Sequence, residues 1–362
     1  MKHIYFTVTN DLTYDQRMHR ICTSLSEAGY RVTLVGRKLP YSKPLKESGY
    51  GQKRLRCAFN KGFLFYAEYN LRLFFFLLGK RMDGICAIDL DTILPCLFIS
   101  KLKSVPRIYD AHEYFTELKE VRTRPFVRRV WLWVERFAVP KFRHGYTVSE
   151  GLATAFREKY AREFCVIRNL PVLRTVQENQ QREKFIVFQG AVNEARGFEY
   201  LIPAMKSIPY QLVVCGDGNF MEKLKALIAA NGVANKVVLK GMMLPDELRV
   251  VAQQAWLGIG LAEKEGINQF HALPNKFLEY MHGGLPQVAM NFPEYKRIND
   301  KYNVAVLVDD LEIVSLVQAI NTAMANDALL HTLSENAMKA RELFCWQNEE
   351  KELLFFYKQV FN

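Results

Sequence analysis

The 362-residue sequence lacks long apolar runs, paired cysteines and low-complexity tracts. Its longest apolar run, residues 73–78, is far shorter than the roughly 20 residues that span a bilayer, so no transmembrane segment is expected. The seven cysteines are scattered and form no C-x-x-C pair, which favours reduced thiols over disulfides or a zinc site. Met1 leads directly into a strand-like pattern, so we expect no signal peptide and a cytoplasmic protein.

Sequence motifs for metal and nucleophilic chemistry are missing as well. The chain contains no H-E-x-x-H, H-x-x-E-H, G-x-S-x-G or P-loop pattern and no clustered carboxylate spacing. These absences predict a protein without a bound metal or cofactor.

The charge is unevenly distributed. Residues 1–170 hold 30 Lys and Arg against 16 Asp and Glu, a net charge of +14, whereas residues 171–362 hold 19 against 22. The whole positive excess therefore lies in the first half, which suits a negatively charged partner surface.

Short apolar strands alternate with helical patterns along the chain, as is typical of parallel βαβ units. In the first half the predicted strands are residues 4–8, 31–35, 84–88, 107–109, 145–148 and 165–167. In the second half they are residues 185–188, 211–215, 236–239, 257–261, 287–289 and 305–308. The helical patterns outside residues 270–286 are predicted over 15–28, 63–81, 91–103, 124–139, 150–160, 200–206, 220–230, 245–254, 311–325 and 327–344.

The alternation breaks between Asn169 and Lys184, where Pro171 and a polar run predict a linker. We therefore predict an α/β fold of two facing Rossmann-like domains, residues 1–170 and 171–345, each with a parallel sheet. A ligand cleft is expected between them at the strand ends.

One stretch, residues 270–286, reads as a loop that feeds a short helix. Pro274 fits the first helical position and Gly283-Gly284 ends the helix. A helix start attracts anions, here helped by Lys276, and Glu279 one turn on can accept hydrogen bonds from hydroxyl groups. Phosphate together with hydroxyls indicates a sugar nucleotide. The alternative is an ordinary surface helix with an exposed Lys and Glu.

Glycines at other strand ends are further candidates for phosphate contact. Gly190 opens the segment 190–197, in which Arg196 is placed to clamp a phosphate. Gly216 and Gly218 follow a strand without completing G-x-G-x-x-G, so they are a weak signal, and Met242 follows another. A plain βα turn with a surface Arg, and a core Met, are the alternatives.

In the first half, residues 109–113 place three ionisable side chains directly after a strand. His112 among them titrates near neutral pH, and a strand end facing a cleft suits acid–base or substrate-orienting groups. The alternative is that His112 and Glu113 only cap the next helix.

Two stretches of the first half, residues 63–81 and 122–143, combine basic and aromatic side chains. This composition suits an anionic membrane face, and no nucleic-acid-binding motif accompanies it. A plain buried helix with solvated Arg side chains is the alternative.

The order and spacing of several stretches carry a resemblance to a known family. The stretches are residues 15–17, 24–32, 87–91, 109–113, 147–152, 167–169, 190–197, 213–218 and 278–286. Together they resemble the retaining glycosyltransferases of family four, the glycosyl transferases group one, which have the GT-B fold. The resemblance implies a nucleotide-sugar site in the C-terminal domain, an acceptor site in the N-terminal domain, and residues 346–362 crossing back onto the latter.

The resemblance also assigns roles. Glu279 matches the glutamate that holds the ribose hydroxyls, Arg196 stands where the family has a diphosphate-binding Lys, and His112 matches a position near the donor sugar and acceptor. Two positions depart: Ala191 replaces an Arg of the diphosphate clamp, for which Lys276 is our substitute, and His271 replaces a glutamate that holds the donor sugar. We expect catalysis to involve His112, Arg196 and Lys276, and donor binding to involve Gly190, Gly216, Gly218, Met242, His271, Asn275 and Glu279.

The predicted function is metal-independent hexosyl transfer, with retention, from a nucleoside-diphosphate sugar to a glycan or lipid-linked acceptor. Polysaccharide or lipid-linked glycan synthesis at the cytoplasmic face of the membrane is the expected setting, without nucleic acid as a partner. A nucleotide-sugar epimerase, a sugar phosphorylase and a non-catalytic nucleotide-binding relative are the alternatives on the same two-domain fold.

Overall fold

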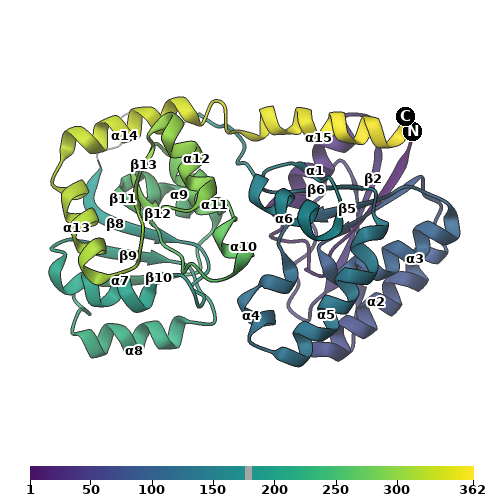
Figure 1. Cartoon of the computed structure of the whole chain (residues 1–362), viewed down its shortest axis with the longest axis horizontal. Coiled ribbons are helices and arrows are strands. Elements are labelled where there is room, and N and C mark those ends of the chain that lie inside the picture. The colour runs from purple at the N-terminus through teal and green to yellow at the C-terminus, as the bar shows by residue number, and fades with distance from the viewer. Residues whose placement is uncertain (176–181) are drawn as a thin grey trace. The chain divides into compact units, whose positions relative to one another are not determined.

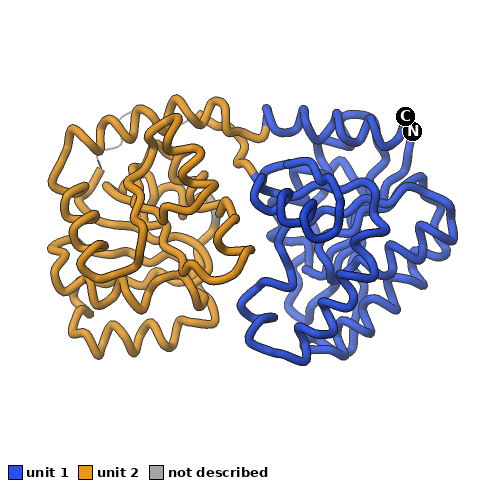
Figure 2. Tube along the Cα trace, in the orientation of Figure 1, with its two compact units in different colours: residues 1–169, 347–362 blue, residues 170–346 orange. Residues whose placement is uncertain are grey.

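The computed structural model describes residues 1–175 and 182–362. The chain forms two compact units (Figure 2), of which unit 1 is Met1–Asn169 with Gln347–Asn362 and unit 2 is Leu170–Trp346. The predicted linker includes residues 176–181, which lie outside the described residues.

Unit 1 contains a parallel sheet in the order β3-β2-β1-β4-β5-β6-β7. Figure 1 labels β2, β5 and β6 of this sheet. Its strands are β1 (His3–Thr7), β2 (Arg31–Lys38), β3 (Gly51–Arg56), β4 (Gly84–Ile88), β5 (Arg107–Ala111), β6 (His144–Thr147) and β7 (Cys165–Val166). Its helices are α1 (Gln16–Glu27), α2 (Gly62–Leu78), α3 (Ile93–Lys103), α4 (Lys119–Arg122), α5 (Pro125–Ala138), α6 (Glu150–Tyr160) and α15 (Trp346–Phe361), with 3-10 turns η1 (Leu90–Thr92), η2 (Phe115–Glu117) and η3 (Val139–Lys141).

Unit 2 contains a second parallel sheet, in the order β10-β9-β8-β11-β12-β13. Its strands are β8 (Glu183–Gln189), β9 (Gln211–Cys215), β10 (Val237–Gly241), β11 (Ala255–Gly260), β12 (Gln287–Met290) and β13 (Ala305–Val308). Its helices are α7 (Phe198–Ala204), α8 (Met221–Asn231), α9 (Pro245–Gln254), α10 (Gly266–Phe270), α11 (Asn275–His282), α12 (Pro293–Tyr302), α13 (Ile313–Met324) and α14 (Asp327–Ala340), with the 3-10 turn η4 (Met205–Ser207).

Local sequence explains why these elements form where they do. In α1 the side chain of Asp15 accepts the N–H of Met18 (3.0 Å), and Gly29 follows the helix with φ +90°. The apolar side chains of α1 face the sheet, and the strands it connects are fully buried on their inner faces. Capping, periodicity and a closing glycine together delimit this helix. Helix α6 shares the side-chain cap, with Ser149 accepting the N–H of Leu152, and α8 shares the closing glycine, Gly232.

The strand order positions the sites. In unit 1 it reverses direction between β1 and β4, and in unit 2 between β8 and β11. In doubly wound sheets, ligands bind outside the carboxyl ends of the strands at such a reversal. The loops after these four strands are therefore where functional side chains belong.

Helix α15 packs on the sheet of unit 1. The hydroxyl groups of Tyr357 and Tyr146 are 3.2 Å apart, and Glu349 accepts the backbone N–H of Arg168 (2.6 Å). A Cβ at Gly84 would lie 2.4 Å from the Phe361 ring, so the glycine at the start of β4 makes room for the helix.

The prediction of two Rossmann-like α/β units with parallel sheets is confirmed. Strand β3 and helices α4, α10 and α12 were not predicted. The placement of Pro274 was wrong: its extended ψ of 145° makes it the N-cap, and Asn275 is the first helical residue. An N-cap holds non-helical backbone angles, which Pro274 adopts as readily as helical ones.

Candidate functional site

Glycines stand at the carboxyl ends of three neighbouring strands in unit 2. Gly190 follows β8, Gly216 follows β9 and Gly241 ends β10. The N–H of Gly190 donates to the Cys215 carbonyl (2.9 Å), and the N–H of Gly216 donates to the Gly241 carbonyl (2.8 Å). A Cβ at Gly216 would lie 1.8 Å from the Gly190 carbonyl oxygen, so only glycine allows this approach. A Cβ at Gly190 would meet nothing within 4 Å, so this strand end is open.

Gly218 lets the loops after β8 and β9 pack together. A Cβ there would lie 2.3 Å from the Val192 carbonyl oxygen. The N–H of Val192 donates to the Asp217 carbonyl (3.0 Å), and the Val192 carbonyl accepts the N–H of Phe220 (3.0 Å). The glycines singled out in the sequence thus shape one edge of the unit 2 sheet.

Arg196 lies in the loop between β8 and α7, held by an unusual backbone. Ala195 and Gly197 on either side have φ values of +64° and +74°. The Ala195 carbonyl accepts the side-chain N–H of Gln269 (3.0 Å), which anchors the loop. The guanidinium of Arg196 is half-buried and makes no hydrogen bond or ion pair with the described residues.

Lys276, in the first turn of α11, is a second cation without a partner. Its buried Nζ lies 3.7 Å from the centroid of the Phe188 ring, at the end of β8, and no described residue hydrogen-bonds to it. Burial, and then the charge of Arg196, hold the pKa of Lys276 well below its ordinary value, while Glu279 opposes the shift. A bound anion would compensate both Lys276 and Arg196.

Glu279 is held by a short polar chain from β8. The side-chain amide of Gln189 donates to the Glu279 carboxylate, and the N–H of Gln189 donates to the Tyr280 hydroxyl (3.0 Å). That hydroxyl donates in turn to the Val187 carbonyl (3.1 Å). The Tyr280 ring lies over Gly258 of β11, where a Cβ would be 2.7 Å away. Helix α11 is therefore docked so that the exposed Glu279 carboxylate keeps a defined position.

The other predicted donor-binding residues lie in unit 2 with different exposure. Met242 follows β10 and is 79% exposed, and Asn275 is exposed at the first position of α11. The Nδ1 of His271 is buried without a hydrogen-bond partner among the described residues. Burial and the nearby charge of Arg297 lower the pKa of His271, and Glu294 raises it. His271 is therefore a polar group whose bonding capacity is unused.

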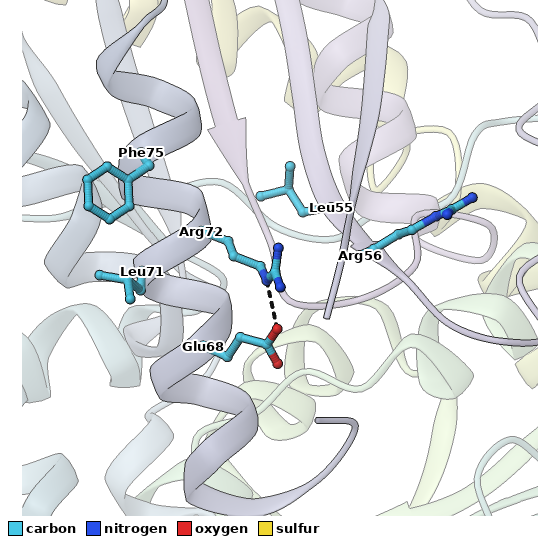
Figure 3. A pocket seen from close by; sticks show the side chains of 6 residues that line it. All are labelled: Leu55, Arg56, Glu68, Leu71, Arg72 and Phe75. Atoms are coloured by element: carbon cyan, nitrogen blue, oxygen red, sulfur yellow. Dashed lines mark hydrogen bonds and ion pairs between the residues drawn. The ribbon is translucent and has the colours of Figure 1, made fainter. Parts of the chain in front are cut away.

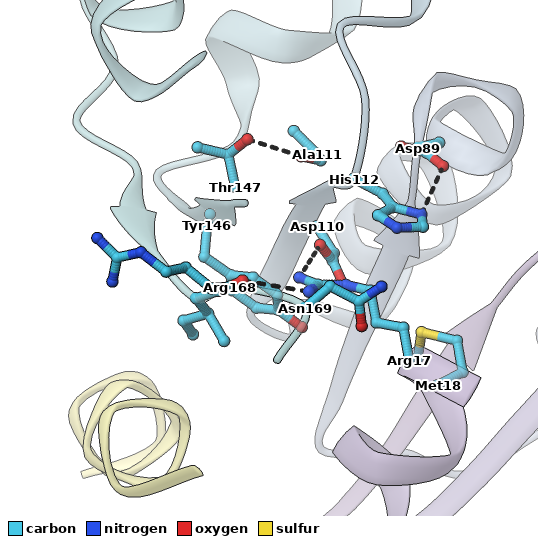
Figure 4. A network of polar contacts seen from close by, with 12 residues as sticks. Arg17, Met18, Asp89, Asp110, Ala111, His112, Tyr146, Thr147, Arg168 and Asn169 are labelled. Carbon is cyan, nitrogen blue, oxygen red and sulfur yellow. Dashed lines mark hydrogen bonds and ion pairs between the residues drawn. The ribbon is translucent and has the colours of Figure 1, made fainter. Parts of the chain in front are cut away.

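His112 lies in unit 1, directly after β5, so the predicted catalytic residues are divided between the two units. Its Nδ1 is 3.8 Å from Oδ2 of Asp89, which follows the adjacent strand β4 (Figure 4). The other carboxylate oxygen of Asp89 accepts the N–H of Glu113 (3.1 Å). Carboxylates and one imidazole therefore gather at the edge of this sheet.

A buried ion pair supports the same edge (Figure 4). Nη2 and Nε of Arg17 donate to the Asp110 carboxylate (2.9 and 3.2 Å), and Nη1 donates to the Ile167 carbonyl (3.1 Å). Both side chains are almost completely buried. The pair ties α1, β5 and the segment after β7 together beneath His112.

Helix α2, which carries the first basic–aromatic stretch, is apolar on two sides. The side chains that it buries in unit 1 are Phe65, Tyr69, Leu73 and Leu77. On the opposite side, by helical periodicity, the exposed side chains are Leu64, Leu71, Phe75 and Leu78, with exposed fractions between 44% and 62%. Helix α5, which carries the second stretch, exposes Phe126 and Trp133.

A groove of about 480 Å³ lies beside this exposed side of α2 (Figure 3). It is lined by Leu55, Arg56, Glu68, Leu71, Arg72 and Phe75. Glu68 accepts the backbone N–H groups of Phe59 and Ala58 as well as Nε of Arg72 (2.7 Å). These bonds, the backbone ones first, lower the pKa of Glu68 to about 2.

No group of three or more His, Cys, Asp or Glu residues in the described parts of the chain is arranged to hold a metal ion. Among the same residues, no single helix is long and apolar enough to cross a membrane. Helices α13 and α14 satisfy those criteria only as a pair bent by 87°.

Two family models match consecutive parts of this chain. Residues 14–169 match a model described as a glycosyl transferase 4-like domain, and residues 171–340 match the model of glycosyl transferases group 1. The chain belongs to the glycosyl transferases group 1. The resemblance to the glycosyl transferases group one is thereby confirmed, and the protein is a glycosyltransferase.

Curated relatives are distant. The alpha-D-kanosaminyltransferase of Streptomyces kanamyceticus is 22% identical over 337 residues, which cover 85% of this chain and 84% of that protein. An uncharacterised glycosyltransferase of Methanocaldococcus jannaschii is 27% identical over 186 residues, or 49% of this chain and 46% of the relative. The chain thus spans about half the length of this archaeal relative.

Solved structures share the fold. The sucrose-phosphate synthase of Thermosynechococcus elongatus has a TM-score of 0.83 at 16% identity, covering 100% of this glycosyltransferase and 99% of that chain. The HepE protein of Anabaena in complex with UDP-glucose has a TM-score of 0.74 at 15% identity, covering 99% and 100%. The fold of the glycosyltransferase is GT-B, as predicted.

Sequence reasoning missed Gln189 and Asp89. Gln189 is the polar residue that ends β8 after the apolar run 185–188, and that position alone was a signal. Asp89 follows the apolar β4 directly, so the rule that singled out residues 109–113 at a strand end applied to it as well.

Proposed function

We propose that this glycosyltransferase binds a nucleoside-diphosphate sugar at the carboxyl edge of the unit 2 sheet. The observation that carries the proposal is the convergence of two unpaired cations, Lys276 and Arg196, beside the open strand end at Gly190. A diphosphate would bond both cations and accept from backbone N–H groups there. The relative HepE, which shares the fold, binds UDP-glucose.

The remaining predicted residues extend this site along the donor. Glu279, fixed by Gln189, accepts hydrogen bonds from the ribose hydroxyls. The backbone around Gly216 and Gly218, with Met242, faces the base. His271 and Asn275 contact the donor sugar, and the unused Nδ1 of His271 makes it the residue that selects among sugars.

In the proposed reaction the bond between the anomeric carbon and the diphosphate oxygen breaks while a bond from that carbon to an acceptor hydroxyl oxygen forms. Negative charge grows on the departing diphosphate, so Arg196 and Lys276 stabilise the transition state more than the ground state. The acceptor proton passes to the departing phosphate on the same face, which yields retention without a side-chain nucleophile. Neither step requires a metal ion, and the family resemblance is the basis for giving His112 a role in the transfer.

Product analysis tests this reaction against its rivals. The protein is incubated with UDP-glucose and other nucleotide sugars, with and without glycan and lipid-linked acceptors. Transfer predicts nucleoside diphosphate release that depends on acceptor, and a product with the anomeric configuration of the donor. An epimerase would convert the donor without acceptor, a phosphorylase would require inorganic phosphate, and a non-catalytic relative would shift only its melting temperature.

The ribose role of Glu279 has its own control. Glu279→Ala should weaken UDP binding because the hydroxyls lose their acceptor, whereas Ala in place of the exposed Glu222 should leave the affinity unchanged. Equal affinities for wild type and Glu279→Ala would contradict the role.

We also propose an anionic membrane as the partner of unit 1, with a lipid-linked acceptor in cell-envelope polysaccharide or glycan synthesis and a peripheral cytoplasmic location. The exposed side of α2 and the exposed rings of α5 supply apolar contact, and the net charge of +14 in residues 1–170 supplies attraction to anionic lipid. Each basic residue near such a surface contributes about 1 kcal/mol.

Vesicle sedimentation at low salt measures this partner. Wild type should sediment with phosphatidylglycerol vesicles and less with neutral ones, and serine at both Leu71 and Phe75 should reduce the bound fraction. Serine in place of Phe355, an exposed ring on α15, is the matched control. Absence of sedimentation by the wild type would overturn the membrane proposal and leave the transfer reaction untouched.

A further inference from the structure

Asp89 holds a backbone conformation that an aspartate rarely adopts. It follows β4 with φ +56° and ψ 179°, a combination that glycine alone adopts readily. Residues in such conformations persist only where their surroundings hold them, and they gather at functional sites. A glycine at this position would be the unstrained choice, so the carboxylate itself calls for an explanation.

The contacts of Asp89 hold its carboxylate toward β5. Its backbone N–H donates to the Asp110 carbonyl (2.9 Å), which continues the pairing of β4 with β5 beyond the strand. Its Oδ1 accepts the N–H of Glu113 (3.1 Å), and its Oδ2 lies 3.8 Å from Nδ1 of His112. The side chain of Asp89 is 18% exposed and that of His112 is 36% exposed, so the carboxylate lies on the inner side of the ring (Figure 4).

The neighbouring charges leave the imidazole as the partner of this carboxylate. Asp110 is already neutralised by Arg17, and Asp91 accepts the hydroxyl of Thr9 (2.5 Å). Burial, and then the charges of Glu113, Asp91 and Asp110, raise the pKa of Asp89 well above its ordinary value. The imidazole of His112, with Nδ1 at 3.8 Å from Oδ2, is the basic side chain that faces this crowded carboxylate.

We infer that Asp89 is a positioning residue, which directs Nδ1 of His112 toward the sheet and leaves Nε2 as the nitrogen that meets substrate. Because Nδ1 always faces the same carboxylate, the neutral imidazole keeps a single tautomer. The strained backbone is the means by which the carboxylate reaches the ring from the end of β4. This inference rests on the proposed role of His112 in sugar transfer.

Glycine in place of Asp89 separates positioning from structural support. Asp89→Gly removes the carboxylate and relieves the backbone, so its melting temperature should equal or exceed that of wild type. Its kcat should fall about 10- to 100-fold while KM for the donor changes less than 2-fold. Ser104, at φ +52° at the end of α3, provides the matched control: Ser104→Gly should also be at least as stable, with kcat unchanged.

A double-mutant cycle tests whether Asp89 acts through the histidine. In a His112→Ala background, Asp89→Gly should lower kcat less than 2-fold further, because the ring it positions is gone. A second full loss of 10- to 100-fold in that background would overturn the inference.

Nitrogen-15 spectra of full-length protein labelled at histidine report the tautomer directly. The His112 signals are assigned as those missing from the spectrum of His112→Gln. The wild type should show one tautomer and Asp89→Gly a mixture. An unchanged ratio would overturn the inference whatever the kinetics show. This measurement needs no substrate, so it is independent of the activity assay. Absence of transferase activity with every donor would refute the proposed function, and the spectra would still decide whether Asp89 positions His112.

Discussion

Replacing Lys276 by methionine should stabilise the empty glycosyltransferase and weaken its binding of UDP. The buried Nζ lacks a hydrogen-bond partner among the described residues, and its pKa is well below the ordinary 10.5. Methionine retains the contact with the Phe188 ring and removes the buried amine. The same amine is the group that we expect the diphosphate to engage.

The size of the stability gain follows from linkage. At pH 7.5 a lysine can avoid charge burial by releasing its proton, which costs at most about 4 kcal/mol relative to an unfolded pKa of 10.5. The folded state therefore binds fewer protons than the unfolded state between its lowered pKa and 10.5, so the stability of the wild type rises with pH in that window. Lys276→Met should gain up to about 4 kcal/mol near neutral pH and nothing above pH 10.5.

Binding should move in the opposite direction. A hydrogen bond to a charged group contributes about 1.5–3 kcal/mol, so Lys276→Met should weaken UDP binding by about 10- to 100-fold. Chemical denaturation at several pH values measures the stability, and titration calorimetry measures the affinity. Lys206→Met, at an exposed position of unit 2, should change neither. A loss of stability in Lys276→Met, or an unaltered UDP affinity, would refute the reasoning.

Three further substitutions have defined expectations. Burial raises the pKa of Asp91 from 3.8 to about 7, so the stability of the wild type should fall as pH rises between these values. Asp91→Asn should therefore increase the free energy of unfolding at pH 8 by about 4 kcal/mol, measured by chemical denaturation. Gly216→Ala should lower the free energy of unfolding by about 2–4 kcal/mol, because the new Cβ clashes with backbone. Gly232→Ala is the control and should lower it by only about 1 kcal/mol, because φ there is +67° but the space is open. Equal melting temperatures of the two variants would contradict this reasoning. Arg17→Met should lower the free energy of unfolding by about 3–5 kcal/mol, because Asp110 stays buried without its partner. Adding Asp110→Leu should recover much of this stability. A double variant as unstable as the single variant would argue against the mechanism.

The sequence predicted the βα order because strands and helices of doubly wound sheets differ in periodicity and length. Strand β3 was not predicted because Gly51–Arg56 is an edge strand with both faces partly exposed. It therefore shows no buried apolar pattern, and it depends on pairing with β2. Helix α12 was not predicted because its sequence is largely polar, although it buries Tyr295 and Ile298.

For the site, the sequence alone determined which chemical groups are available. They are the strand-end glycines Gly190 and Gly216, the basic side chains of Arg196 and Lys276, and the carboxylate of Glu279 on α11. Turn glycines and helix starts are local features, so local patterns identify them. Only the tertiary structure decided that Lys276 lies buried over Phe188 without a partner and that Gln189 holds Glu279. Asp89 facing His112 from the neighbouring strand was likewise a tertiary result. These arrangements join residues far apart in the chain, and their burial and pairing depend on which strands become neighbours in the sheet, which no local pattern records.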